Sequence, residues 1–179
     1  MKFFLFLILL LNLALNADDK YLMRVAYGIA DKNDLGQILT GNPATTDKYL
    51  AVVTIDGGYL LKENFLNLPI DIYLKGGLST FNEKVNNNAY EALVYIKAYY
   101  NLDFLDNTVR IGLGEGFSYT SRILEAEYDD VHEDPNNILS SARFLNYLDI
   151  TVDFDVGKLI DYKPMHETYL GYLLKHSSG

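Results

Sequence analysis

The sequence predicts an all-β protein: an antiparallel, up-and-down transmembrane β-barrel with eight strands expected and about seven present. Three observations predict this fold. Apolar and polar residues alternate with period two over long segments, the connections between these segments alternate between long and short, and no segment shows helical periodicity over three turns. The clearest segments are longer than ordinary soluble strands and match the roughly 9 to 11 residues that a tilted membrane strand needs.

The alternation is clearest from Tyr90 to Phe104. One face there carries only apolar side chains, and the other carries Glu91, Lys97, Asn101 and Asp103. The segment from Arg143 to Val156 repeats the pattern, and only Asn146 breaks its apolar face. Both segments are therefore predicted to be strands with one apolar and one polar face.

Five further segments show weaker versions of the same pattern, which brings the predicted strands to about seven. They are Leu22 to Ile29, Tyr49 to Leu61, Pro69 to Phe81, Thr108 to Thr120, and Thr168 to Ser178. A missed strand, or a bulged pair within Lys48 to Leu61, is the alternative to this count.

The connections fall into two groups that alternate along the chain. Those expected at one end are Ala30 to Lys48, Asn82 to Ala89 and the long acidic Ser121 to Ser141; those at the other are Lys62 to Leu68, Leu105 to Asn107 and Gly157 to Glu167. Outer-membrane barrels have long outer loops and short periplasmic turns. The first group is therefore predicted to face outside.

A membrane barrel turns apolar side chains toward lipid and polar ones toward the lumen. The side chains predicted to point inward are Glu91, Lys97, Asp103, Arg110, Asp149, Asp153 and Asp155, with Gly112, Gly114 and Gly116 making room for larger neighbours. An aromatic girdle is expected from Tyr99, Tyr100, Tyr119, Tyr147, Tyr169 and Tyr172. A soluble β-sandwich would show the same alternation in the opposite sense.

The N-terminus has the layout of a secretory signal peptide, predicted over residues 1–17 with cleavage after Ala17. Residues 18–179 then form the barrel domain, and the predicted location is the cell outer membrane. The net charge of -9 argues against nucleic acid as a partner. The chain has no cysteine, so neither a disulfide framework nor a lipoprotein anchor is expected.

Seven strands do not close a bacterial single-chain barrel, whose strand number is even. In lipid, an open sheet edge leaves backbone N–H and C=O groups without partners, and each such group costs roughly several kcal/mol of stability. The sequence is therefore expected to be C-terminally truncated and to lack at least an eighth strand.

The last predicted strand carries the only residues that point to chemistry. His176 and Ser178 are two residues apart, which on a strand means one face and a Cα separation of about 7 Å. A His beside a Ser is the pair that activates a hydroxyl nucleophile. The competing interpretation is a polar pair at the barrel rim, where the strand meets the head groups.

A β-barrel with His-x-Ser on the outer face of its last strand resembles the PagL-type lipid A 3-O-deacylase family. The resemblance implies that Ser178 is the nucleophile, His176 the general base and the Gly179 N–H an oxyanion donor, with lipopolysaccharide (lipid A) as partner and substrate and no metal or cofactor. The family usually has Asn where this chain has Gly179. Its orienting Glu would lie beyond residue 179, since Glu115 is two strands away, about 10 Å.

Two other functions remain open at the level of sequence. One is a non-enzymatic structural or adhesive barrel that acts through its acidic outer loops. The other is a secreted lipocalin-like carrier, which would turn its apolar face inward around a ligand.

Overall fold

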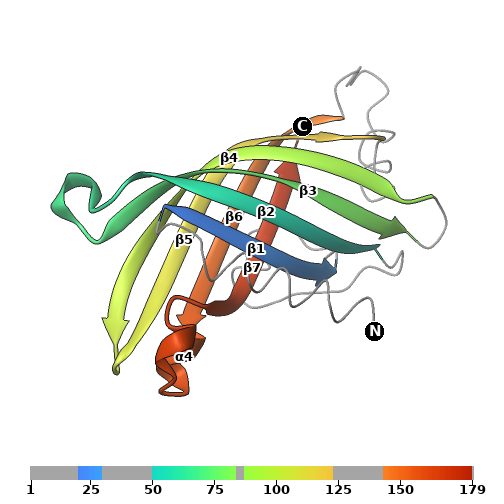
Figure 1. Ribbon diagram of the computed structural model, residues 1–179. Helices are drawn as coiled ribbons and strands as arrows, with labels where there is room; N and C mark the ends of the chain where they lie inside the picture. The colour runs from blue at the N-terminus through green and yellow to red at the C-terminus, as the bar shows by residue number, and fades with distance from the viewer. Residues whose placement is uncertain (1–19, 30–49, 84–86, 123–142, 179) are drawn as a thin grey trace.

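The computed structural model describes residues 20–29, 50–83, 87–122 and 143–178. These residues form one sheet of seven antiparallel strands, ordered β1 to β7 as in the chain and curved into a nearly closed barrel (Figure 1). The strands are β1 (Tyr21–Ile29), β2 (Leu50–Lys62), β3 (Ile70–Glu83), β4 (Ala89–Phe104), β5 (Asn107–Thr120), β6 (Phe144–Asp155) and β7 (Tyr169–Ser178).

The prediction of an all-β, up-and-down barrel is confirmed, and each predicted strand ends within two residues of an observed one. Of the predicted Tyr49 to Leu61 segment, the described residues form a single strand, β2, not a bulged pair, with one register shift against β3 between Leu60 and Lys62. Helix occurs only in connections among the described residues: η1 (Phe65–Asn67), α4 (Val156–Leu159) and η2 (Lys163–Met165). The last two fold part of the predicted Gly157 to Glu167 turn.

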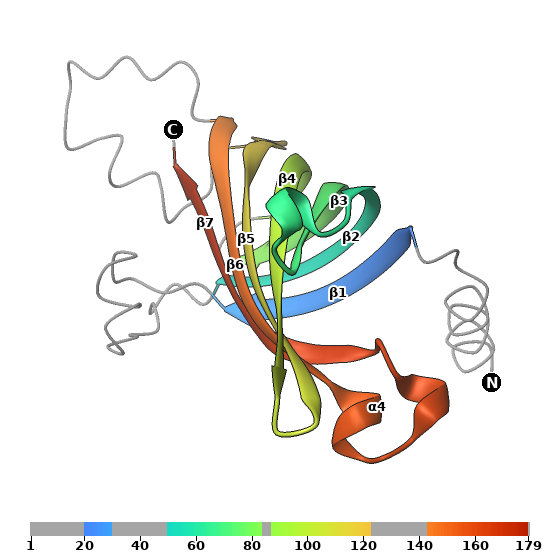
Figure 2. The same cartoon turned by 90° about the vertical axis from the view of Figure 1, so that its left-hand side faces the viewer.

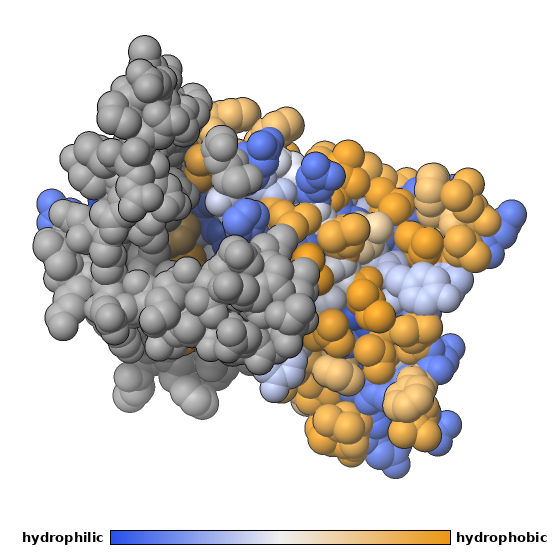
Figure 3. Space-filling model, turned by 180° about the vertical axis from the view of Figure 1, so that it is seen from behind, coloured by the Kyte–Doolittle hydropathy of each residue, from blue (hydrophilic) through white to orange (hydrophobic). Residues whose placement is uncertain are grey.

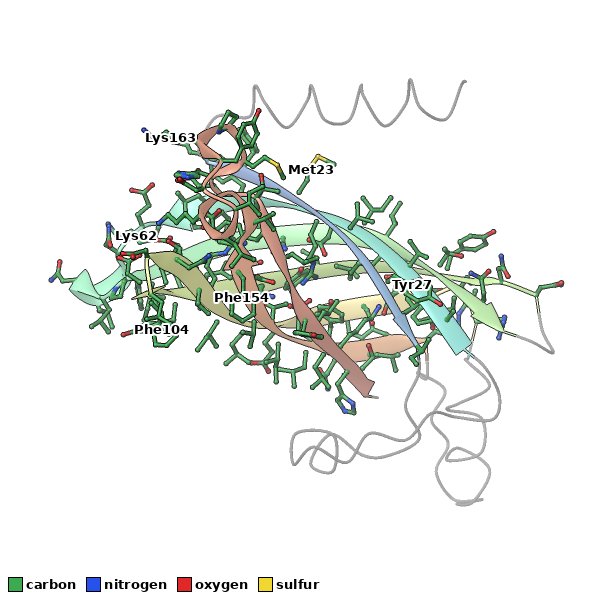
Figure 4. All side chains as sticks on the ribbon, turned by 90° about the horizontal axis from the view of Figure 1, so that it is seen from below. Met23, Tyr27, Lys62, Phe104, Phe154 and Lys163 are labelled. Carbon is green, nitrogen blue, oxygen red and sulfur yellow. The ribbon has the colours of Figure 1, made fainter. Side chains whose placement is uncertain are left out.

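The strand ends next to the two groups of connections lie at opposite ends of the barrel. Figure 4 shows Lys62, Phe104 and Lys163 toward one end, and Tyr27 toward the other. Because consecutive strands run in opposite directions, β1, β3, β5 and β7 all finish at the second end. The last residues of β7, which include His176, therefore lie at the end where β1 and β3 also finish.

The polarity of the sheet is the reverse of that in a water-soluble protein. The buried side chains are mostly polar or charged: Thr54, Asp56, Lys75, Ser79, Glu91, Lys97, Ser118, Thr120, Asp149, Thr151 and Asp155. The outward side chains are mostly large and apolar, as along β1, where every second residue from Tyr21 to Ile29 is more than half exposed. Hydrophobic residues accordingly cover much of the described surface in Figure 3.

The aromatic girdle prediction is wrong for three of its six tyrosines. Tyr100, Tyr119 and Tyr172 are exposed on the outer face, but Tyr99 and Tyr147 are buried in the lumen. Tyr169 also faces inward, with the Arg110 guanidinium carbon 3.3 Å from its ring centroid. The physical reason is strand parity, since Tyr99, Tyr147 and Tyr169 share the face of the inward lysines and aspartates.

The strands β1 and β7 form the two edges of the sheet, and Figure 2 shows how its curvature carries them round toward each other. Among the described residues, β1 pairs only with β2 and β7 only with β6. Both edge strands run in the same direction, so one further strand of opposite direction would be antiparallel to each. Within the described ranges no helix is long and apolar enough to cross a membrane.

Candidate active site on the outer face

The orientation of β7 is set by its inward lysine. The Lys175 ammonium donates to Ser79 Oγ at 3.1 Å and pairs with the Glu91 carboxylate on the far side of the lumen. Since side chains alternate along a strand, His176 points outward, and it is exposed. The prediction that His176 lies on the outer face is confirmed.

Ser178 is the last residue of β7, two positions after His176, and its backbone pairs with Asn146 of β6. The alternation of the strand therefore assigns position 178 to the same outer face as His176. Gly179 lies outside the described residues, as do residues 1–17 of the predicted signal peptide. The roles assigned to Gly179 and to those residues stay predictions.

The strand register places Glu115 and His176 in one row across the sheet. Glu115 of β5 pairs with Leu148 of β6, and Leu148 pairs with His176 of β7. Two strand spacings separate Glu115 from His176, about 10 Å. Leu148 lies between them on the outer face, so Glu115 does not orient the imidazole directly.

Asn146, Glu115 and His176 form a polar cluster on the outer face. Asn146 is the member of this cluster for which the sequence predicted no role. Its signal was present, because it is the single break in the apolar face of β6. The register now places it opposite Ser178 and next to the row of His176. His176, Asn146 and Glu115 are exposed polar residues on an outer face whose other members near them are Phe117, Leu148 and Ile150.

Beneath this cluster, the lumen holds a network of buried charges. The Asp149 carboxylate accepts from Arg24 at 2.6 Å and from the Tyr147 hydroxyl at 2.9 Å, and it pairs with the Lys97 ammonium. The side chain of Asp149 is fully buried. A buried carboxylate needs such partners, because an unpaired charge in a low-dielectric interior is very costly.

Arg24 extends the network across the barrel. From β1 it also donates to Asp56 of β2 at 2.7 Å and to the Tyr95 hydroxyl of β4 at 2.8 Å, and Asp56 in turn pairs with Lys75 of β3 at 2.7 Å. One guanidinium therefore links the first strand to the sixth. These contacts connect strands across the curved sheet and fix the position of β6. The outer face of β6 carries Asn146.

Of the charges predicted to point inward, most are paired as expected. Glu91 and Lys97 have the partners described above, and Arg110 faces Asp153 at 3.7 Å. Asp155 caps α4 by accepting the Lys158 N–H at 2.9 Å. Asp103 has the inward parity but is exposed, because it lies near the end of β4, where the hairpin extends beyond the packed lumen.

The glycines of β5 make room for this interior, as predicted. A Cβ at Gly114 would lie 2.8 Å from Cδ2 of Tyr95, whose ring packs against Tyr147 at a centroid distance of 5.0 Å. At Gly112 the Tyr99 ring would be 2.9 Å away. The lumen is thus filled in part by large side chains of β4 that fold over the small residues of the neighbouring strand β5.

No cluster of three or more metal-ligating side chains occurs in the part of the chain that the structure describes. Comparison of the chain with family models, with curated proteins and with solved structures gave no match. The features that bear on function are therefore the polarity of the barrel and the polar cluster of its outer face.

Proposed function

We propose that this chain is an outer-membrane β-barrel that carries, on its lipid-facing surface, an esterase site for lipid A. The observation that supports the membrane location is the reversed polarity of the strands. Charged side chains such as Asp149 and Lys97 are buried in the lumen, whereas Val25, Leu78 and Leu113 are more than half exposed outside. Hydrocarbon is the environment in which such an exposed apolar face is stable.

The polar cluster lies near one end of the apolar face, at the tip of β7. If the first strand leaves the periplasm, this is the outer end of the barrel. The acyl esters of lipopolysaccharide lie in the leaflet at that end. A site there takes its substrate directly from the membrane. This placement favours a lipid ester over a soluble one, because the cluster is bordered by Leu148 and Leu174 rather than by the charged lumen.

In the proposed reaction, His176 removes the proton of the Ser178 hydroxyl while Ser178 Oγ attacks the ester carbonyl carbon. The tetrahedral intermediate collapses with cleavage of the ester C–O bond, and the protonated imidazole gives its proton to the departing sugar oxygen, which leaves as a hydroxyl. Water then attacks the acyl-serine with His176 again as base. The products are a free fatty acid and lipid A with one acyl chain fewer.

The test is mass spectrometry of lipid A from cells that express the full-length protein or its Ser178→Ala variant. We expect the full-length protein to remove one ester-linked acyl chain and Ser178→Ala to remove none. An acyl number that stays constant in both would exclude catalysis by this pair. Heat-modifiable gel migration of both proteins is the control for folding, and a freely water-soluble monomer would overturn the membrane location.

A non-enzymatic structural or adhesive barrel is the second candidate. Leu148 lies between Glu115 and His176, so no carboxylate among the described residues orients the imidazole. This arrangement favours a barrel without enzymatic activity. A carrier of apolar ligands has less support, because such a carrier needs an apolar cavity and this lumen is filled with ion pairs.

A further inference from the structure

The outer face of β6 contains one residue that does not suit a lipid-facing strand. Its outward residues from Phe144 to Phe154 are apolar except Asn146, which is exposed. An amide that faces hydrocarbon without a partner is costly. Polar residues in such positions are rare and usually serve a function.

The register gives Asn146 a specific neighbour. It is directly opposite Ser178, and residues paired in this way on an antiparallel ladder have Cα atoms about 4.5 to 5.5 Å apart. Side chains of such a pair that share a face are close enough to contact the same small group. Asn146 therefore borders the position from which the proposed nucleophile acts.

The Asn146 amide is also uncommitted. Among the described residues it has no hydrogen-bond or ion-pair partner, and the same is true of the His176 imidazole. By contrast, Asn101 and Asn107 use their side-chain amides in hydrogen bonds to Asp71 and to the Asp155 carbonyl. A free amide can donate two N–H groups to a ligand.

We propose that the Asn146 side-chain amide donates a hydrogen bond to the oxyanion that forms when Ser178 attacks an acyl ester. This inference rests on the proposed function. It places the developing negative charge over the β6–β7 ladder, so that the acyl chain extends along Leu148 and Ile150 toward the middle of the apolar face. Donors aimed at such an oxyanion are the largest single contribution to acyl transfer in many enzymes.

The test uses the full-length protein refolded in detergent micelles, with p-nitrophenyl dodecanoate as the probe. We expect Asn146→Leu to lower kcat about 10²- to 10³-fold, the usual effect of removing one oxyanion donor, with KM changed by about twofold or less. Leucine suits the apolar surroundings of position 146, so this variant is expected to fold. Asn146→Asp, which keeps the shape but cannot donate, is expected to lose at least as much.

The matched control is Val152→Ala, a truncation on the same face of the same strand but distant from Ser178. It is expected to leave kcat unchanged, and heat-modifiable migration checks the fold of every variant. One outcome would refute the role of Asn146 and leave the proposed function standing. In that outcome the unsubstituted protein is active, Ser178→Ala is inactive, and Asn146→Leu has an unchanged kcat. If the unsubstituted protein and Ser178→Ala hydrolyse the probe equally, both are refuted.

Discussion

The inner and outer faces of the same strands are stabilised in different ways. On the inner face each buried charged residue has a specific partner, and Arg24 has three, in Asp56, Asp149 and Tyr95. On the outer face the apolar side chains need no particular partner, because contact with any hydrocarbon surface removes them from water. Specific contacts therefore fix the shape of the barrel from inside, while its surroundings determine whether the outer face is stable.

The comparison also shows why the polar cluster of the outer face is conspicuous. Lys175 and His176 are adjacent in sequence, yet the lysine has two partners across the lumen and the exposed histidine has none among the described residues. A buried charge inside the lumen is explained by its pairing. A polar group on the outer face is not so explained, and it needs a ligand, a head group or a reaction to account for it.

The largest expected effect is the loss of the central inward anion. Asp149→Asn leaves the buried cations Arg24 and Lys97 without their shared carboxylate, and we expect the free energy of unfolding to fall by about 3 to 5 kcal/mol. Urea unfolding in detergent micelles, followed by the heat-modifiable gel band, measures it. Asp103→Asn, at an exposed position, should change stability by less than about 1 kcal/mol.

A double variant sharpens this prediction. Replacing Lys97 by Met in the Asp149→Asn background removes one of the stranded cations, so part of the lost stability should return. If Asp149→Asn alone proves as stable as the unsubstituted protein, the network does not hold the sheet in its curved shape.

A charge on the outer face should have the next largest effect, and only in lipid. Leu113 is 57% exposed near the middle of β5, between Ala98 and Ile150, with no acidic residue paired to it. In phospholipid vesicles, Leu113→Arg should cost about 2 to 4 kcal/mol, as charged residues do at the bilayer midplane.

The matched control for this substitution is Leu105→Arg in the β4–β5 turn, where a cost of about 0 to 1 kcal/mol is expected at the membrane surface. Urea unfolding in vesicles compares the two. Equal stabilities for the two variants would mean that the outer face is not in hydrocarbon.

Much of the fold could be predicted from sequence because parity is a local property. Alternation in Tyr90 to Phe104 and in Arg143 to Val156 identified the strands and the side on which each charge lies. Parity does not give distance across the lumen, so it could not show that Arg24 of β1 reaches Asp149 of β6. That contact depends on the curvature and stagger of the whole sheet.

The site was predictable to a similar extent. The spacing of His176 and Ser178 predicts that they share one face, and the outward orientation of His176 followed once Lys175 was known to point inward. The role proposed for Asn146 needed the register, because sequence shows that it breaks an apolar face but not that it is opposite Ser178. The girdle prediction failed at Tyr99, Tyr147 and Tyr169 because it used residue type alone and ignored strand parity.

The smallest expected effect concerns the β4–β5 hairpin, where the inner and outer faces meet. Leu105 and Asp106 have φ of 49° and 61°, the pattern of a type I′ turn, which favours Asn and Gly over a leucine. Leu105→Asn should therefore raise the free energy of unfolding by about 0.5 to 1 kcal/mol, since Asn adopts the left-handed conformation at lower cost. Urea unfolding in micelles and in vesicles gives the value in each medium.

The Leu105 side chain is 84% exposed, so the substitution removes little contact with the described residues. Asp103→Asn, two residues away in the strand, is the control for a change of side chain without a change of turn conformation. A gain in both media would mean that Leu105 lies in water. A loss of stability confined to vesicles would mean instead that its side chain enters the bilayer, and that the apolar outer face continues past the end of β4 into the turn.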